Sequence, residues 1–405
     1  MEQKKKLRLK DRITIHMKKT KPIKWQICLG LSIILLILLF VMGMSHETQR
    51  TKAPAALTTS KVQLRVTFTG DIQISDNVRK LAQDTGYSGL FKGVSKYWSK
   101  SDYVAANISG PILKYDVSHY TSTRDKNETS NYLRPRAARG MSDAGINLFS
   151  FANDDAYNYG RTGIKSTISV LDEYNIEYLG ISDDSKNPIY KVLEYTFHDT
   201  SGKMEKRNVA VMSVNDVIRK HSTVGEGKEG IINSSMTEVY EKLYQASEEC
   251  DYVIAYVHFK NGTEAEERET AQAMVDAGAD VVIGNSNILQ SVEKYGDGII
   301  AYGLGNFVTD ETSTYDKDAA MLDFVVRNSG EVILYFTPVR VEEGRPEVTT
   351  EQLYLRRIQA TLTKNLPDDC YRITESGMVR LSLGQLPELN QPEMEDDNTW
   401  RNNDQ

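Results

Sequence analysis

The stretch GADVVIGNSNILQSVEKYGDGIIAYGLGNFV, residues 278–308, decides the fold. It contains two short apolar runs, Val281–Ile283 and Ile299–Ala301, and each run leads into a polar turn that contains glycine. The two turns are Gly284–Asn287 and Gly303–Asn306. Buried strands that end in polar turns typically form the rim of a ligand site in an α/β domain.

The pattern of a strand followed by a polar turn recurs through the chain. Residues 62–68 alternate apolar and polar side chains, which is the period of a half-buried strand. Further strands are predicted at residues 103–106, 147–151, 177–179, 189–197, 208–214, 251–257, 320–326 and 332–336. Helical patterns are predicted at residues 90–98, 133–144, 163–174, 235–249 and 264–277, the fourth opened by a capping box at Ser235–Glu238. Strands and helices in alternation predict a layered α/β fold.

Composition limits the class of protein. With 405 residues, of which 40% are hydrophobic, the chain can bury a large core without a disulfide framework. Its cysteines, Cys28, Cys250 and Cys370, include no close pair, which excludes a zinc knuckle and a dithiol redox motif. The net charge is −7, but the residues before Trp25 carry +8, so the rest of the chain carries −15. This acidic body argues against nucleic acid as a partner.

A membrane-spanning helix is predicted near the N-terminus. Residues 25–44, WQICLGLSIILLILLFVMGM, contain no charged side chain. A helix of about 20 residues spans the roughly 30 Å of a bilayer core. Because the lysines before this segment are expected to stay in the cytoplasm, the sequence predicts a single-pass protein of the cell membrane with an extracellular C-terminal domain. A cleaved signal peptide is the alternative, for which the apolar run is too long.

Shifts in composition predict the domain boundaries. Residues 1–24 form a basic cytoplasmic segment, and residues 45–61 form a stalk rich in Thr, Ala, Ser and Lys. The remaining boundaries place an extracellular domain at 62–340, a C-terminal extension of unassigned role at 341–386 and an acidic, disordered tail at 387–405.

Polar side chains follow five of the predicted strands. In layered α/β folds the carboxyl ends of strands converge on one rim, where ligands bind. Aspartate, asparagine and histidine supply oxygen and nitrogen ligands to divalent ions. The strand-end residues are Asp71, Asn107, Asn153 with Asp154 and Asp155, His258, and Asn285 with Asn287.

These segments resemble the CapA family of capsule biosynthesis proteins, which act in poly-γ-glutamate synthesis and have a metallophosphoesterase-like fold. GADVVIG, ILQSVE and IIAYGLGNFV are similar to the last third of the family, and the resemblance covers residues 64–307. It implies an αββα sandwich with two sheets inside and helices outside. The positions that match the family motifs GD, N-x-E, A-N-N-H and H-W-G are Asp71, Asn107, Asn153 and His258.

The chain departs from the family at several metal motifs. Ser109 stands where the family has glutamate, and Asp154 and Asp155 stand where it has Asn-His. Asn285 and Asn287 occupy a turn in which the family carries histidines. Because asparagine contributes no charge, a two-metal hydrolytic site lacks ligands. The departures imply a degenerate site that holds one Mg²⁺, Mn²⁺ or Ca²⁺ ion, or none.

The candidate residues receive roles from this resemblance. Asp155 and His258 are the candidate catalytic groups. The predicted metal ligands are Asp71, Asn153, Asp155 and His258. The predicted substrate-binding residues are Asn107, Asn285 and Asn287.

Structural roles are the alternative for the same residues. Asp71 is equally expected as a turn cap, and Asp154 with Asp155 as acidic residues at a helix N-terminus. The two asparagines of the 284–287 turn are typical turn formers. Tyrosines near the predicted rim are interpreted as packing residues in preference to a polymer groove; they are Tyr157, Tyr159, Tyr256 and Tyr302.

The resemblance implies a role in making or exporting an anionic cell-surface polymer such as poly-γ-glutamate, beside a membrane synthase or export complex. In one hypothesis the domain is a binding or scaffold subunit with a degenerate metal site, which the missing glutamate and histidines favour. In the other it is a metal-dependent hydrolase or transferase acting on a phosphate ester or amide of the polymer. Asp71, Asp155 and His258 would then bind one ion.

Overall fold

The structure is a computed structural model that describes residues 10, 18, 29–37, 62–124, 131–198, 204–217, 219, 221–259 and 264–383. The chain divides into two units, Met1–Thr51 with Glu351–Leu353, and Lys52–Thr350 with Tyr354–Gln405. In the first unit, residues 29–37 are helical. The remainder of the predicted membrane span, the stalk and the acidic tail lie outside the described residues. In the described part of the chain, no helix is both long and apolar enough to cross a membrane.

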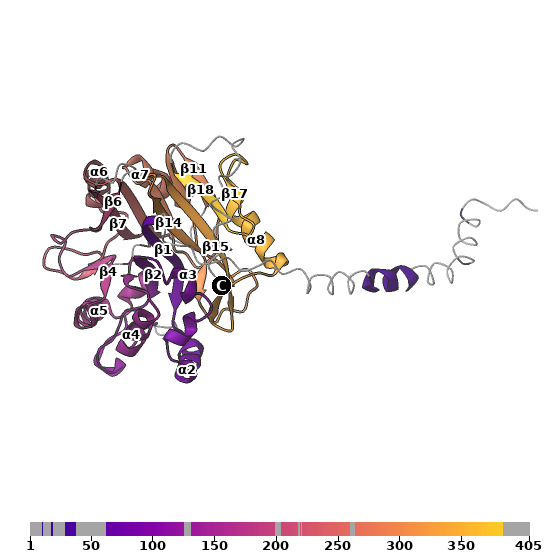
Figure 1. Ribbon diagram of the computed structural model, residues 1–405. Coiled ribbons are helices and arrows are strands. Elements are labelled where there is room, and N and C mark those ends of the chain that lie inside the picture. Colours follow the sequence, from indigo (N-terminus) through magenta and orange to yellow (C-terminus); the bar gives the residue numbers. More distant parts are fainter. Residues whose placement is uncertain are drawn as a thin grey trace, which may run out of the picture. The chain divides into compact units, whose positions relative to one another are not determined.

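The second unit contains two large β-sheets (Figure 1). In the ten-stranded sheet, β1 to β4 run parallel, β13 pairs in parallel with the end of β1, and β14 continues the sheet from β1 in antiparallel fashion. The strand order is β17 (Arg372–Ile373), β18 (Val379–Leu383), β15 (Val332–Glu342), β14 (Asp318–Arg327), β1 (Val62–Gln73), β2 (Tyr103–Ser109), β3 (Leu148–Ser150) and β4 (Glu177–Leu179), with β13 (Asn306–Val308) beside β1 and β16 (Arg345–Val348) beside β15.

The six-stranded sheet has four parallel strands at its centre and an antiparallel strand at each edge. The strand order is β11 (Val292–Tyr295), β12 (Gly298–Ala301), β10 (Val281–Gly284), β9 (Tyr252–His258), β7 (Met204–Asn215) and β6 (Tyr190–His198). The short strands β5 (Ile181–Ser182) and β8 (Gly230–Ile231) pair separately. Both apolar runs of the 278–308 stretch are therefore neighbouring central strands, β10 and β12.

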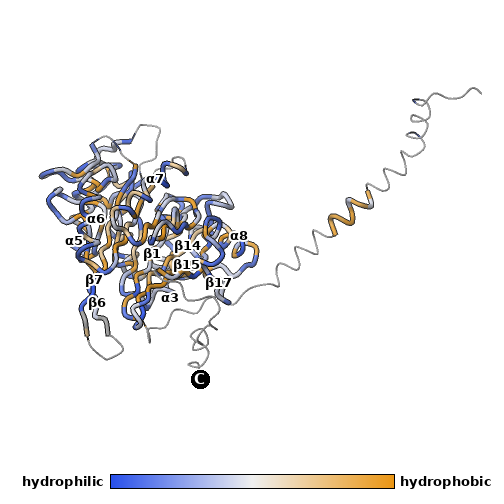
Figure 2. Tube along the Cα trace, turned by 90° about the horizontal axis from the view of Figure 1, so that it is seen from above, coloured by the Kyte–Doolittle hydropathy of each residue, from blue (hydrophilic) through white to orange (hydrophobic). Residues whose placement is uncertain are grey.

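An apolar core lies between the two sheets. Phe68 of β1 and Phe324 of β14 pack in it with Tyr256 of β9 and Ile283 of β10, and all four side chains are buried. Strands covered on both faces are apolar along their length, which explains the continuous apolar runs of β9 and β10. Figure 2 shows the apolar residues gathered in the strands and the hydrophilic ones around the periphery.

Helices cover the outer faces of the sheets (Figure 1). α2 (Asp76–Thr85), α4 (Pro135–Asp143) and α5 (Gly160–Tyr174) share a second core with β2 and β3. α6 (Thr237–Glu249) and α7 (Glu264–Asp276) share a third core with β7, β9 and β10. The described residues thus form a mixed α/β fold, as the sequence predicts.

Two helix predictions differ from the structure. The predicted helix at residues 90–98 is replaced by the short helices η1 (Ser88–Phe91) and α3 (Ser95–Trp98), with Gly93, a poor helix former, in the turn between them. The capping box at Ser235 does not form, because α6 begins one residue later than the box requires and Met236 precedes it without a side-chain cap.

The strands β1 and β2, which carry candidate residues, run further than predicted. β1 continues to Gln73 and β2 to Ser109, so Asp71 and Asn107 lie within strands. The alternative that Asp71 caps a turn is therefore wrong.

Residues after 340 contribute to the same ten-stranded sheet. β15 continues to Glu342, and β16 and β18 both pair with it in antiparallel fashion. Between these two strands, α8 (Gln352–Thr363) places Ile358 and Leu362 in the core between the sheets. Residues 341–383 thereby cover and extend one side of the sheet.

The buried hydroxyl of Tyr256 joins the two sheets beneath the candidate site, and the Ser150 and Ser213 hydroxyls, 2.6 Å apart, form a second buried contact between them. The register of β1 and β2 shifts between Phe68 and Asp71. At this gap the Tyr256 hydroxyl donates to Thr69 O at 2.6 Å and accepts from the Asn107 main-chain amide at 3.1 Å. Because buried main-chain groups need partners, the hydroxyl from the other sheet compensates for the interrupted ladder.

Tyr256→Phe is expected to destabilise the protein by about 2 to 4 kcal/mol, since it leaves a buried carbonyl and a buried amide without partners. Urea unfolding of the full-length chain in detergent, followed by tryptophan fluorescence, measures this change. Tyr252→Phe on the same strand is the control, because the Tyr252 hydroxyl makes only an exposed contact, 3.5 Å from Gly330 O. We expect Tyr252→Phe to change the free energy of unfolding by about 0.5 kcal/mol or less. Equal effects of the two substitutions would contradict the bridging role.

Candidate functional site

The candidate residues meet where strand ends of the two sheets approach each other. His258 ends β9, and its ring is hydrogen-bonded to Asn285, which follows β10. The Nε2 atom of His258 lies 3.9 Å from Oδ1 of Asp154, which follows β3 of the other sheet. Asp71 and Asn107 are register partners in that other sheet. The site is thus assembled from both sheets.

The carboxylate of Asp71 is buried and hydrogen-bonded. Its Oδ1 atom accepts from Asn107 Nδ2 at 2.5 Å and from Ser109 Oγ at 2.8 Å, and Ser109 Oγ also lies 2.8 Å from Oδ2. Only 6% of the residue is exposed. Ser109 therefore supplies a hydrogen-bond donor to Asp71.

Burial raises the pKa of Asp71 to about 6, because the charged carboxylate loses hydration in the interior. The charge of His258 and the hydrogen bonds from Ser109 and Asn107 lower this pKa, while Asp155 raises it. Metal ligands must be deprotonated. Below about pH 6 a proton therefore competes with any cation for Asp71.

The carboxamides of Asn107 and Asn153 are used within the fold. Asn153 Nδ2 donates to Asn107 Oδ1 at 3.0 Å and to a main-chain oxygen of β2 at 2.9 Å. Asn153 Oδ1 accepts from Ala156 N at 2.9 Å and thereby caps the 3₁₀ helix η3 (Asp154–Tyr157). Both side-chain oxygens already accept a hydrogen bond, so these asparagines hold strand ends together.

Asp154 and Asp155 form ion pairs with Arg124. Arg124 Nη2 donates to Asp154 Oδ2 at 2.9 Å and also contacts Asp155 Oδ1. Asp155 accepts two further hydrogen bonds, from Asn158 Nδ2 to Oδ1 at 3.1 Å and from Asn131 Nδ2 to Oδ2 at 3.2 Å. The two carboxylates lie in the first turn of η3, where the structural alternative expects them.

A second arginine reaches the same turn. Arg219 Nη1 donates to the main-chain oxygen of Asp154 at 3.1 Å and to Asn158 Oδ1 at 3.2 Å. Arg124 Nε donates to the same Asn158 oxygen at 2.7 Å. Although burial opposes the charge of Arg124, Asp155 and Asp154 raise the pKa of its guanidinium above the ordinary value. Two guanidinium groups therefore contact the turn that carries Asp154 and Asp155.

Among the described residues, the His258 ring is hydrogen-bonded through Nδ1 alone. Its Nδ1 atom lies 2.8 Å from Asn285 Oδ1, so Nδ1 carries the proton and donates it. In the neutral ring this leaves the lone pair on Nε2. Asn285 is fully buried, and its Nδ2 atom has no hydrogen-bond partner among the described residues. Asn287 is exposed and lies outside this network.

The donor set does not fit a two-metal hydrolytic centre, which needs several anionic and imidazole ligands. Among the described residues, no three His, Cys, Asp or Glu side chains gather as a ligand set. Asp71 is engaged by Ser109 and Asn107, and Asp155 is engaged by Arg124. Two of the predicted metal ligands are thus engaged by hydrogen-bond donors or in an ion pair.

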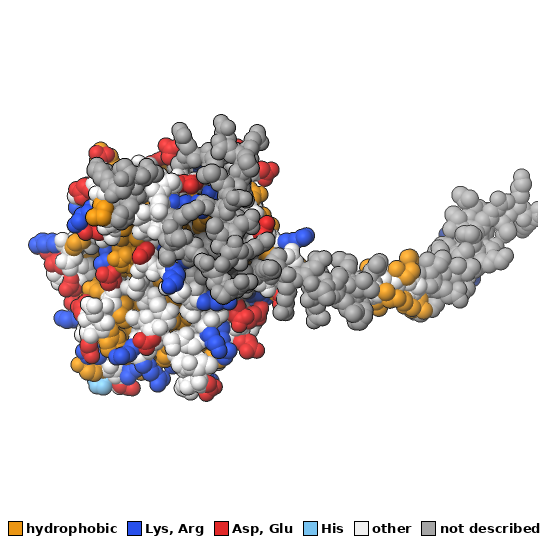
Figure 3. Space-filling model, viewed as in Figure 1, with side chains coloured by type: hydrophobic (Ala, Val, Ile, Leu, Met, Phe, Trp, Pro, Cys, Tyr) orange, Lys and Arg blue, Asp and Glu red, His pale blue; other side chains and the backbone are white. Residues whose placement is uncertain are grey.

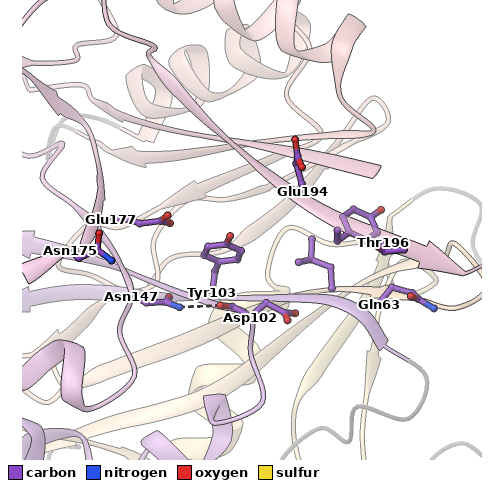
Figure 4. A pocket seen from close by; sticks show the side chains of 10 residues that line it. Gln63, Asp102, Tyr103, Asn147, Asn175, Glu177, Glu194 and Thr196 are labelled. Atoms are coloured by element: carbon purple, nitrogen blue, oxygen red, sulfur yellow. Dashed lines mark hydrogen bonds between the residues drawn. The ribbon is translucent and has the colours of Figure 1, made fainter. Parts of the chain in front are cut away.

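A groove of about 630 Å³ lies away from the candidate site, at the opposite ends of the parallel strands (Figure 4). Asp102 and Tyr103 at the start of β2, Glu177 at the start of β4 and Glu194 of β6 line it. Figure 4 shows side chains from both sheets beside this groove. None of the predicted site residues lines it.

Charges of both signs cover the surface. On the described residues of the face seen in Figure 3, acidic and basic side chains are interspersed. Ion pairs between exposed or half-buried side chains, such as Lys114–Glu173 and Arg207–Asp251, also occur in the structure. The described residues of the face in Figure 3 show no continuous basic track.

The sequence pattern identifies the strand-end residues and misses the arginines. Arg124 and Arg219 lie in segments without strand or helix periodicity, so no signal marks them. Asn158 ends η3 and is missed for the same reason. The tyrosines interpreted as packing residues are all buried, which confirms that interpretation; they are Tyr157, Tyr159, Tyr256 and Tyr302.

Known proteins share this sequence pattern. Residues 65–311, more than half of the chain, match the family model described as "Bacterial capsule synthesis protein PGA_cap". The "Capsule biosynthesis protein CapA" of Bacillus anthracis is 28% identical over 370 residues, which cover 89% of this chain and 87% of that protein. The "PGA biosynthesis protein CapA" of Bacillus subtilis (strain 168) is 26% identical over 326 residues, which cover 78% of this chain and 82% of that protein.

Two solved structures are more distantly similar. A hypothetical protein from Thermus thermophilus has a TM-score of 0.38 and 15% identity, and the match covers 71% of this chain and 97% of that chain. The calcineurin-like phosphoesterase YfkN from Bacillus subtilis has a TM-score of 0.35 and 14% identity, with coverages of 74% and 97%. At these TM-scores neither structure supports an inference about the site.

Asp71→Asn tests the burial of this carboxylate through pH. Because the folded-state pKa is raised to about 6, the stability that comes from protonating Asp71 is present below about pH 4 and is lost as the pH rises through 6. Relative to the variant, the wild type should lose roughly 2 kcal/mol between pH 4 and pH 7. Urea unfolding across this range measures the difference, with the exposed Asp297→Asn as substitution control. Parallel pH profiles of wild type and Asp71→Asn would contradict the burial argument.

Proposed function

The chain belongs to the bacterial capsule synthesis protein family PGA_cap, and from that membership we propose that it takes part in the synthesis or export of an anionic capsular polymer. The names of its relatives, which refer to capsule and PGA biosynthesis, support poly-γ-glutamate as the polymer class. Within this role, the domain acts as a binding or scaffold subunit without hydrolytic activity.

The observation that carries the non-catalytic role is the engagement of the predicted metal ligands. Asp71 accepts hydrogen bonds from Asn107 and Ser109, and Asp155 is paired with Arg124. A hydrolytic metal centre requires carboxylates that are free to bind the ion and a nucleophilic oxygen beside it. These carboxylates are instead used to hold the rim of the fold.

The proposal includes a place at the cell membrane. The uncharged segment 25–44 supports a single-pass anchor, and the basic residues before it support a cytoplasmic N-terminus. The folded domain then lies outside the cell, next to a membrane complex that makes or exports the polymer. A subunit in that position needs a stable polar rim and no chemistry of its own.

One observation favours a second candidate function, a metal-dependent hydrolase or transferase. Nε2 of His258, which holds the lone pair when the ring is neutral, lies 3.9 Å from the carboxylate of Asp154. An imidazole in this state can accept a proton or bind one divalent ion. Asn285 would orient the ring for either task through its contact with Nδ1.

Surface polymer on cells distinguishes the two functions. In a strain that lacks its own copy of the gene, His258→Gln and Asp71→Asn should restore polymer to within about twofold of wild type, whereas losing an acid–base group typically lowers a rate by about 100-fold or more. Polymer per cell is measured after extraction, and the amount of each variant is measured by immunoblot.

His119→Gln, at an exposed helix end, is the matched control for the histidine substitution. A strong loss of polymer in His258→Gln or Asp71→Asn at normal protein level, with His119→Gln unaffected, would contradict the scaffold role and support the enzyme.

A further inference from the structure

Two adjacent carboxylates at the site share one guanidinium. Arg124 Nη2 lies 2.9 Å from Asp154 Oδ2 and contacts Asp155 Oδ1. The side chains are largely withdrawn from solvent, with 20% of Arg124, 25% of Asp154 and 16% of Asp155 exposed. At this burial, water and salt screen the charges less than at an open surface. Two carboxylates so close together need a cation between or beside them.

The geometry leaves Asp155 little capacity for another cation. Its Oδ1 atom receives Arg124 and Asn158, and its Oδ2 atom receives Asn131. A metal ion would have to displace these donors to reach the carboxylate. Asp154 is less occupied, since its Oδ1 atom faces His258 Nε2 at 3.9 Å.

We propose that Arg124 is the resident cation of this site and that its guanidinium prevents Asp154 and Asp155 from binding a divalent ion. The inference rests on the proposed function, because both assume that the site lacks a working metal centre. It goes further, because it proposes that Arg124 provides the positive charge that a metal ion would otherwise provide. A guanidinium suits this task, since it is always charged and its donors match carboxylate geometry.

The proposal implies a latent metal site. Without the guanidinium, the carboxylate oxygens of Asp154 and Asp155 lose their ion-pair partner, and Nε2 of His258 lies 3.9 Å from Asp154 Oδ1. Carboxylate oxygens and one imidazole suit Mn²⁺. Beside His258, Nδ2 of Asn285 is buried and has no hydrogen-bond partner among the described residues, so the hydrogen bonding of this part of the site is incomplete.

Arg124→Gln tests the proposal, because glutamine keeps a polar side chain and removes the charge. The full-length chain, purified in detergent and treated with EDTA, is melted with and without millimolar MnCl₂. Wild type should show no shift, whereas Arg124→Gln should gain about 2 °C or more in Tm. Elemental analysis after gel filtration should then find Mn²⁺ with the variant only.

Two further variants test whether Asp155 is a ligand of Mn²⁺ and whether loss of any arginine changes the response to Mn²⁺. Arg161→Gln is the matched control, since Arg161 donates to the main-chain oxygens of Glu229 and His221, and it should behave as wild type. The double variant Arg124→Gln/Asp155→Asn should lose the Mn²⁺ response, because it removes a ligand of the latent site.

A Mn²⁺ shift in wild type equal to that of Arg124→Gln would overturn the proposal, as would a folded Arg124→Gln without any shift. If Arg124→Gln does not fold alone, MnCl₂ should restore its folding by supplying the missing charge, and failure to do so overturns the proposal. Because the readout is metal binding by purified protein, it is separate from the polymer measurement that tests the proposed function.

Discussion

The hydroxyl of Tyr256 is the contact on which the geometry of the rim depends. It reaches from β9 into the gap between β1 and β2 and satisfies Thr69 O and the Asn107 amide. Glycine next to this gap is required, since a Cβ at Gly70 would lie 1.8 Å from Gly305 O. With the two sheets fixed in this way, Asp71 meets Asn107, and residues that follow β3 meet His258 of β9.

Charge balance within the protein explains the remaining chemistry of the site. Ser109 and Asn107 stabilise the buried Asp71, and Arg124 compensates Asp154 and Asp155. Asparagine side chains complete the network as neutral connectors. The strand ends therefore still meet at one rim, but the carboxylates there form hydrogen bonds and ion pairs within the protein. A role in capsule polymer synthesis then fits a subunit that recognises or positions partners without performing hydrolysis.

Much of the fold could be predicted from the sequence, because buried parallel strands give short apolar runs such as Val281–Ile283. The meeting of Asp71, Asn107 and Asn153 also followed, since parallel strands bring their ends to one edge. Arg124 could not be found, because it lies in a loop where no periodicity marks a side chain that pairs across 30 residues. The role of Tyr256 was hidden too, since burial in a strand does not reveal which backbone a hydroxyl reaches.

Anomalous diffraction from crystals soaked in MnCl₂ tests the central claim most directly. The account predicts the Arg124 guanidinium in contact with both Asp154 and Asp155, and no anomalous peak within ligand distance, about 2.0 to 2.6 Å, of Asp71, Asp155 or His258 Nε2. A strong peak bound by these side chains, with Arg124 turned away, would contradict it. The site would then be a metal centre, and the search for a hydrolytic substrate would be justified.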